Sequence, residues 1–272
     1  MEDPAHVFQH SRSYRLFLHK LDQIHALLTH AIAGLTEGRK TPDNIIERIE
    51  RAKAGLPPIP VKEPTIKVEL DSEEIELIKS ALEAYKKHQD RLPFYLNSVL
   101  LIALWSGFES YLQGIVVQMF GQNPSELASD KQLSVRELIE RSGGIADYLI
   151  EREVNDFGHL SLEGMFQYLK TRLKFNFQDQ EIALLKELYF LRNIAAHNSG
   201  FIRISQRPMI SDEIEIYHNQ IEIPLNYLKR GLFEVFSLVR RADAYIVERW
   251  NIPKSTEALF EETLNIATDE AL

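Results

Sequence analysis

Residues 182–200, which read IALLKELYFLRNIAAHNSG, hold the pattern that best predicts the fold of this chain. Apolar side chains recur at helical spacing from Ile182 to Leu191. A polar tripeptide closed by Gly200 follows, and it is typical of a helix end because glycine adopts the left-handed cap conformation at little cost. The stretch predicts a helix over 179–198 whose last turns carry an arginine and a histidine.

Working outward from this helix, the same periodicity predicts a chain that is mainly helical. Four prolines over 57–64 favour an extended connector, and residues 34–41 are expected to break the first helix. Alternation over 201–206 and 212–217 predicts a small β-hairpin, and 65–70 predicts a short strand. The expected helices cover residues 7–35, 44–56, 72–90, 93–120, 134–142, 144–157, 161–173, 179–198 and 224–249.

These elements suggest three parts. Residues 1–66 form an N-terminal helix and proline-rich connector, 67–252 a helical bundle, and 253–272 a C-terminal tail. The apolar stripe of the N-terminal helix has three open interpretations: it extends the bundle, covers a dimer, or docks a neutralising partner protein.

Composition narrows the class of protein. The chain has 272 residues and no cysteine, so disulfides, thiolate zinc sites and cysteine nucleophiles are excluded. Its longest apolar run, 99–105, is far shorter than the roughly twenty residues that span a bilayer. The first residues lack the basic start and apolar core of a signal peptide. We expect a cytoplasmic protein with no membrane partner.

The net charge of −9 disfavours tight binding of nucleic acid through phosphates alone. A local basic groove is still compatible with an acidic chain, and the alternative is that the basic residues after residue 200 are ordinary solvated charges. These residues are Arg203, Arg207, Lys229, Arg230, Arg240 and Arg241.

Arg192 and His197 are the residues best suited to chemistry. A guanidinium binds phosphate with a fork of donors, and imidazole transfers protons near neutral pH. The spacing by itself is a weak motif. Five residues of helix rotate by about 140° and rise by about 7.5 Å, so the two side chains point in different directions. Either the arginine curls back, or two chains each contribute to a shared cleft.

The wider context resembles the HEPN superfamily, in particular the branch associated with RiboL-PSP proteins. An apolar helix containing residues 108–112 precedes the Arg192-Asn193-x-x-x-His197 helix, and a long final helix follows from Pro224. The resemblance covers roughly residues 72–250. It implies an all-α, up-and-down helical bundle, a homodimer, and a metal-independent endoribonuclease acting in toxin–antitoxin systems, phage defence or stress.

In this resemblance Arg192, His197 and Asn193 are the catalytic residues. His197 would act as general base or acid, Arg192 would bind the scissile phosphate, and Asn193 would orient one of them. Glu109 and Asn198 are expected to support the site. Glu109 lies on an apolar stripe, so we expect it to pair with Arg192, Asn193 or a backbone amide, with a purely structural carboxylate as the alternative.

No cofactor is expected. His6 and His10 have a helical chelating spacing, but no third ligand is placed to complete a metal site. A Walker loop, a dinucleotide loop and a serine nucleophile elbow are all absent from the sequence. The aromatic residues on helix stripes are expected in the core or at a dimer seam; they are Trp105, Phe108, Tyr111, Phe120, Tyr189 and Phe190.

Three functions remain open at this point. The first is an endoribonuclease acting on RNA such as tRNA or mRNA, with an antitoxin as its partner. The second is a non-catalytic HEPN module that binds RNA or a partner protein. The third is a helical scaffold in which the motif is coincidental.

Overall fold

The computed structural model describes residues 10–54, 72–89, 91–127 and 144–254. Within these ranges the chain is mostly helical, which confirms the predicted all-α character. Its elements in chain order are α1 (Arg12–Lys53), α2 (Ser72–Gln89), α3 (Leu92–Gln122), η1 (Pro124–Glu126), α5 (Ile145–Gly158), α6 (Leu162–Thr171), α7 (Asp179–His197), η2 (Ile204–Met209), β1 (Glu215–Tyr217), β2 (Gln220–Glu222) and α8 (Leu225–Trp250).

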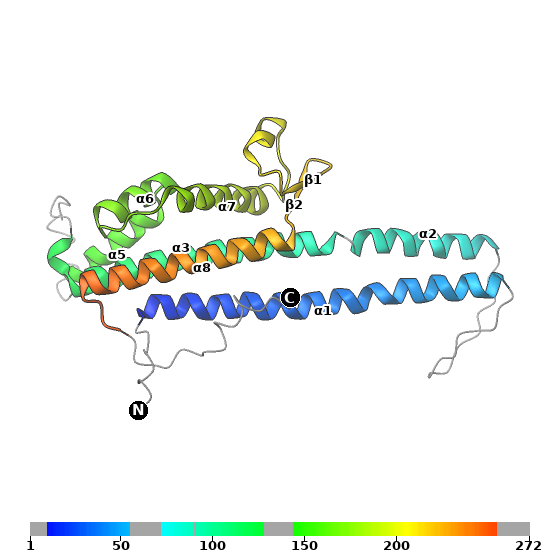
Figure 1. The fold of residues 1–272 in the computed structure, drawn as a ribbon, viewed down its shortest axis with the longest axis horizontal. Helices are drawn as coiled ribbons and strands as arrows, with labels where there is room; N and C mark the ends of the chain where they lie inside the picture. Colours follow the sequence, from blue (N-terminus) through cyan, green and yellow to red (C-terminus); the bar gives the residue numbers. More distant parts are fainter. Residues whose placement is uncertain (1–9, 55–71, 90, 128–143, 255–272) are drawn as a thin grey trace, which may run out of the picture.

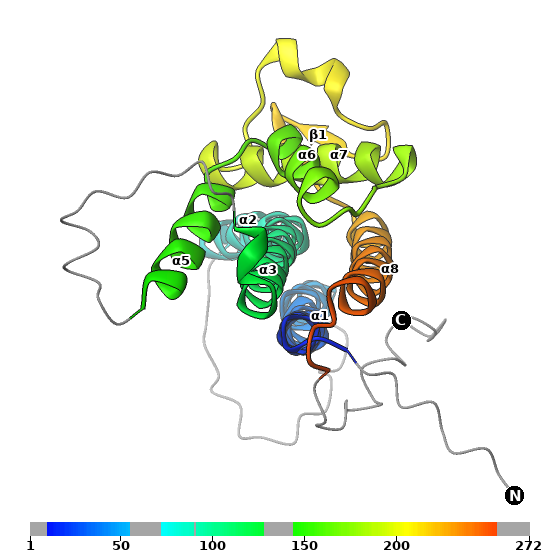
Figure 2. The ribbon, with the colours of Figure 1, turned by 90° about the vertical axis from the view of Figure 1, so that its left-hand side faces the viewer.

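Three long helices, α1, α3 and α8, lie side by side and enclose the core (Figures 1 and 2). Helices α3 and α8 run in the same direction, since the Asn97 side chain donates to Ile223 O near their starts and the Asn123 side chain donates to Trp250 O near their ends. Helix α1 runs the other way, with its start beside the end of α3. The apolar stripe of α1 therefore extends the bundle, as one of the three interpretations anticipated.

Helix α3 is the centre of the molecule. It packs against α1, α5, α7 and α8, so its apolar residues face inward on nearly every side. Of the aromatic residues expected in the core or at a dimer seam, the four on α3 are buried in the core: Trp105, Phe108, Tyr111 and Phe120. Tyr189 and Phe190 on α7 are half-buried against it. By length and composition α3 would also suit a membrane-spanning segment, but more than half of its most apolar stretch is covered by the rest of the molecule, as in a core helix.

Two glycines let α1 approach α3 closely. A Cβ added at Gly114 would lie 2.5 Å from Ser13 Oγ, and one at Gly107 would lie 3.2 Å from Lys20 Cγ. The two glycines are seven residues apart and so lie on the same face of α3. The contact between these helices therefore depends on small residues as well as on apolar area.

The predicted break at residues 34–41 is wrong, because α1 is a single helix of 42 residues. In intrinsic helix propensity Gly34 costs about 1 kcal/mol and Pro42 about 3 kcal/mol. The packing of α1 against α3 and α2 offsets these costs. Beyond the bundle, α2 packs along the second half of α1 and forms an arm with it (Figure 1). The pairing includes ion pairs from Lys79 to Glu50 at 2.5 Å and from Lys86 to Asp43.

Helices α5, α6 and α7 form a second layer over α3 and α8 (Figure 2). The hairpin after α7 exists, but its strands differ from those predicted. Residues 204–209 are 3-10 helix, and β1 pairs with β2 across the turn His218-Asn219. Both turn residues have positive φ, +48° and +62°, which matches the twist of a tight hairpin.

Some predicted elements lie outside the described residues. These are the proline-rich connector over 57–64, the boundary near residue 66, the strand over 65–70, the helix over 134–142 and most of the C-terminal tail.

Candidate functional site

Helix α7 positions the predicted site residues. Its first turn is closed by Glu181, whose Oε2 accepts from Gln178 N at 2.7 Å. Leu185, Leu188, Leu191 and Ile194 form its buried face. This face fixes the rotation of the helix, so Arg192 and Asn193 are left half-buried at its side, and His197 is exposed at its end.

Helix α7 ends where the sequence predicted, and two residues after it form its cap. Ser199 and Gly200 have φ of +51° and +83°, and the amides of Asn198 and Gly200 both donate to Ile194 O. A Cβ at Gly200 would also meet the Gln220 side chain at 3.2 Å. Gly200 therefore serves both the backbone turn and the close approach of β2.

Arg192 lies against α3. Its Nη2 is 3.9 Å from Glu109 Oε2, and its Nη1 donates to Asn193 Oδ1 at 2.9 Å. The expected contact between Glu109 and Arg192 is thus present, as a long ion pair. Arg192 Nε is buried and makes no hydrogen bond to any residue that the structure describes. The guanidinium therefore has donor capacity that its neighbours do not use.

Trp105 orients Glu109. The indole Nε1 donates to Glu109 Oε1 at 2.7 Å, and its ring centroid lies 5.2 Å from that of Tyr189 on α7. One oxygen of the carboxylate is thereby committed to the indole, and the other faces Arg192. The Glu109 side chain is one-third exposed, and it is stabilised by the hydrogen bond from the indole and by the charge of Arg192.

His197 and Arg192 do not meet within one chain. Among the described residues no hydrogen bond joins them, and none holds the His197 imidazole. Asn198 is exposed and caps the helix through its backbone amide. The geometry brings Arg192, Asn193 and Glu109 together and leaves His197 and Asn198 separate at the helix end.

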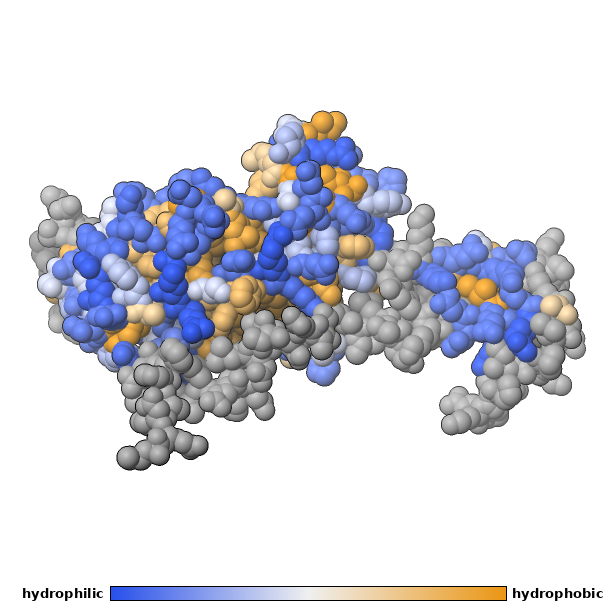
Figure 3. Space-filling view, in the orientation of Figure 1, coloured by the Kyte–Doolittle hydropathy of each residue, from blue (hydrophilic) through white to orange (hydrophobic). Residues whose placement is uncertain are grey.

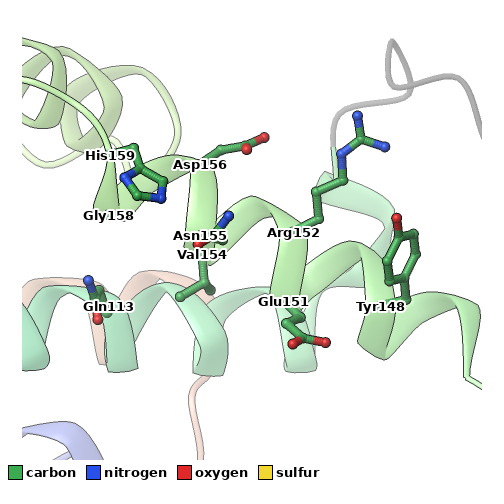
Figure 4. A pocket seen from close by; sticks show the side chains of 9 residues that line it. All are labelled: Gln113, Tyr148, Glu151, Arg152, Val154, Asn155, Asp156, Gly158 and His159. Atoms are coloured by element: carbon green, nitrogen blue, oxygen red, sulfur yellow. The ribbon is translucent and has the colours of Figure 1, made fainter.

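Two cavities of the described part of the chain lie away from the motif. One, of about 780 Å³, lies between α3 and α5 beside Gln113 and His159 (Figure 4). The other, of about 470 Å³, lies between α7 and η2 beside Glu187 and Met209. Arg192 and His197 line neither of them.

Two of the basic residues that follow residue 200 form ion pairs with acidic neighbours. Arg230 makes two contacts of 2.7 Å with Glu213, and Arg241 forms an ion pair with Glu181. Arg203 and Arg207 are exposed around η2. The basic residues after residue 200 therefore carry less unpaired positive charge than their number suggests.

A buried cluster of serine, histidine and aspartate is structural. Asp243 is fully buried and accepts from Ser11 N at 3.0 Å, from Ser11 Oγ, and from His10 Nδ1 at 3.2 Å. A serine nucleophile would donate its hydroxyl to histidine, whereas Ser11 donates to the carboxylate and accepts from Tyr14 N. The cluster caps α1 and ties it to α8.

His10 belongs to this cluster, and His6 lies outside the described residues. In the part of the chain that is described, no three histidine or acidic side chains are grouped to hold a metal.

The contacts that the hairpin makes with Phe201 and Arg91 were not predicted from the sequence. Phe201 forms a bridge with Gln220, and Arg91 lies over the Tyr217 ring at 4.5 Å. The turn His218-Asn219 between alternating residues was the available signal, since asparagine tolerates positive φ.

No protein-family model, curated protein or solved structure matches this chain.

Proposed function

We propose that this protein is a metal-independent endoribonuclease of the HEPN type. One observation carries the proposal: α7 ends with a half-buried arginine whose Nη2 makes only a long ion pair with Glu109 and, five residues later, with an exposed histidine. Phosphoryl transfer from RNA to its own 2′-hydroxyl needs a phosphate-binding cation and a proton carrier, and these two residue types supply them.

The proposed reaction is transesterification. The 2′-oxygen forms a bond to the adjacent phosphorus as the bond from phosphorus to the 5′-oxygen breaks. His197 takes the proton from the 2′-hydroxyl and returns a proton to the departing 5′-oxygen. Arg192 stabilises the negative charge on the phosphoryl oxygens. The products are a 2′,3′-cyclic phosphate and a 5′-hydroxyl, and DNA is not cleaved because it lacks the nucleophile.

Glu109 and Asn193 hold the guanidinium in place before substrate binds. A phosphate approaching Arg192 would replace the long contact with Glu109, since that pair is separated by 3.9 Å and is partly exposed to solvent. Trp105 retains Glu109 during this exchange. The proposal includes a homodimer in which the Arg192 of one copy and the His197 of the other form one site, because the two side chains do not meet in one chain.

The cellular role that goes with this activity is a cytoplasmic toxin or an effector of phage defence or stress, controlled by a partner protein. The second candidate is a HEPN module that binds RNA or a protein without cleaving. It is favoured by the position of Arg192 and His197, which line neither the cavity beside Gln113 nor the cavity beside Glu187.

The test is cleavage of total tRNA and of a labelled single-stranded RNA in excess EDTA. Wild type should yield ends with cyclic phosphate, whereas Arg192→Ala and His197→Ala should not. Matched controls are His159→Ala and Arg249→Ala, exposed residues of the same types away from α7. RNA that stays intact with folded wild type, but is still bound, would favour the second candidate.

Mixing the two inactive variants tests the shared site. After subunit exchange, a pair made of Arg192→Ala and His197→Ala chains holds one intact Arg192–His197 combination, so part of the activity should return. If both residues act within one chain, mixing restores nothing. Sedimentation of each variant shows whether the mixed dimers form.

A further inference from the structure

The surface next to the end of α7 carries a row of planar side chains. Tyr217 is paired with Gln220, and Gln220 is paired on its other side with Phe201. Residues directly opposite each other in antiparallel strands point to the same face. Phe201, Gln220 and Tyr217 therefore form one row across this small sheet. Phe201 is 53% exposed and Tyr217 is 38% exposed.

Arg91 extends the row onto α3. Its guanidinium carbon lies 4.5 Å from the ring centroid of Tyr217 and 5.7 Å from that of Tyr95, which is also 38% exposed. Arg91 Nη2 donates to Gln220 Oε1 at 3.1 Å, and Nε donates to Glu222 Oε1 at 2.9 Å. These bonds hold the guanidinium in the row, and Glu222 offsets its charge.

The exposed rings are not needed to attach the hairpin. Ile221 and Ile202 are buried, and Ile216, on the same face of the hairpin as Ile221, packs at the edge of the core. The row thus occupies the opposite face of the sheet, where polar residues would normally be expected. Apolar residues also gather at the upper edge of the molecule as seen in Figure 3, above the hairpin.

The row of planar side chains starts at Phe201, just past the end of the motif at His197. Phe201 follows His197 by four residues, and the Gln220 side chain donates to Ser199 O at 3.0 Å. The amide of Gly200 is bonded to Ile194 O on α7, and its carbonyl accepts from Ile221 N. These bonds fix the position of the row relative to the last turn of α7.

We propose that the exposed rings of Phe201 and Tyr217 form a stacking platform for unpaired bases of a single-stranded RNA. Arg91 and His218, which both contact the Tyr217 ring, hold that ring in place. The proposal rests on the ribonuclease or RNA-binding function above and names its substrate as unpaired RNA. Aromatic rings and guanidinium planes stack on bases irrespective of sequence. Because the net charge is −9, phosphate contacts alone would bind weakly, and base stacking supplies affinity that does not depend on a basic surface.

Binding is measured in the His197→Ala background, so that RNA is not consumed. Fluorescence anisotropy compares a labelled oligouridine with an abasic oligonucleotide of the same length. Phe201→Ala and Tyr217→Ala should each weaken oligouridine binding roughly 5- to 150-fold, the usual effect of losing one aromatic–base stack. Binding of the abasic strand should not change. Phe201→Trp and Tyr217→Phe keep a ring and should keep the affinity.

Phe233→Ala is the matched control, because Phe233 is an aromatic residue 48% exposed on α8. Its substitution should leave both affinities unchanged. Thermal unfolding of Phe201→Ala and Phe233→Ala should match that of the parent. Tyr217→Ala loses the contact with Arg91, so it should unfold at a slightly lower temperature and remain folded where binding is measured. Equal binding of oligouridine by the parent and the alanine variants would overturn the proposal.

The results of the cleavage and binding assays distinguish a failure of the platform from a failure of catalysis. If wild type cleaves RNA and the ring variants bind as the parent does, the ribonuclease stands and the platform is overturned. If wild type binds unpaired RNA through the rings without cleaving it, the platform stands and catalysis fails. A change of sedimentation mass in the ring variants, without a change in RNA affinity, would assign the row to contact between copies of the chain and overturn the proposal.

Discussion

The indole of Trp105 donates a hydrogen bond of 2.7 Å to Glu109, one turn further along α3, and so directs the carboxylate toward Arg192. Trp105 is buried, whereas the side chain of Glu109 is one-third exposed. The pair therefore joins the core of the bundle to the proposed phosphate-binding arginine.

The contributions of this pair to stability should differ widely. Glu109→Gln keeps an acceptor for the indole and loses only a long, partly exposed ion pair, so it should lower the free energy of unfolding by less than about 1 kcal/mol. Trp105→Ala removes a buried ring and should cost about 3–5 kcal/mol. Urea denaturation measures both. Equal losses would show that Glu109 is a structural residue of the core.

Asp243 should be essential for attaching α1. Asp243→Ala leaves the Ser11 amide and hydroxyl without their buried acceptor, and the expected loss is about 2–4 kcal/mol. Hydrogen exchange should rise first in the opening turn of α1. Glu248→Ala, an exposed acid on the same helix, is the control and should change stability little. Unchanged exchange in α1 after loss of Asp243 would contradict this role.

Two glycine substitutions should have opposite signs. Gly200→Ala forces a side chain into a positive φ and against Gln220, so it should destabilise the fold by about 1–2 kcal/mol. Gly34→Ala lies inside α1 with open space around its Cβ and should stabilise by about 0.5–1 kcal/mol. Thermal unfolding of each variant compares them. Destabilisation by Gly34→Ala would argue against a continuous α1.

Stability should fall in alkali because buried tyrosines must ionise. Burial raises the pKa of Tyr111, and burial with neighbouring Glu187 raises the pKa of Tyr227; burial also raises the pKa of Tyr14. An unfolded tyrosine ionises near pH 10. Folding therefore favours the neutral form of these tyrosines. Their contribution to the free energy of unfolding is fully present below about pH 10 and is lost progressively above it.

Circular dichroism and tyrosinate absorbance, recorded together during a titration with base, test this expectation. The ionisation of the buried tyrosines should coincide with unfolding. Ionisation of all tyrosines before any loss of helical signal would contradict it.

The candidate site was only partly accessible from the sequence. Spacing within α7 predicts its last turns and its end at Gly200. Spacing within α3 predicts that Trp105 lies on a packed face. The contact of Glu109 with Arg192 was expected, although its length of 3.9 Å was not. The row containing Phe201 and Tyr217 was missed, because the hairpin register depends on the turn His218-Asn219 rather than on alternation alone.

Local periodicity thus determined by itself that this chain is mainly helical and where α7 ends. Tertiary structure alone decided that α1 continues past Gly34, that Arg91 meets Tyr217, and that Ser11 meets Asp243 across 232 residues. The physical reason is the range of the interactions. Helical spacing and caps act over a few residues, whereas contacts between distant segments depend on how whole faces pack, and single propensities of about 1 kcal/mol yield to that packing.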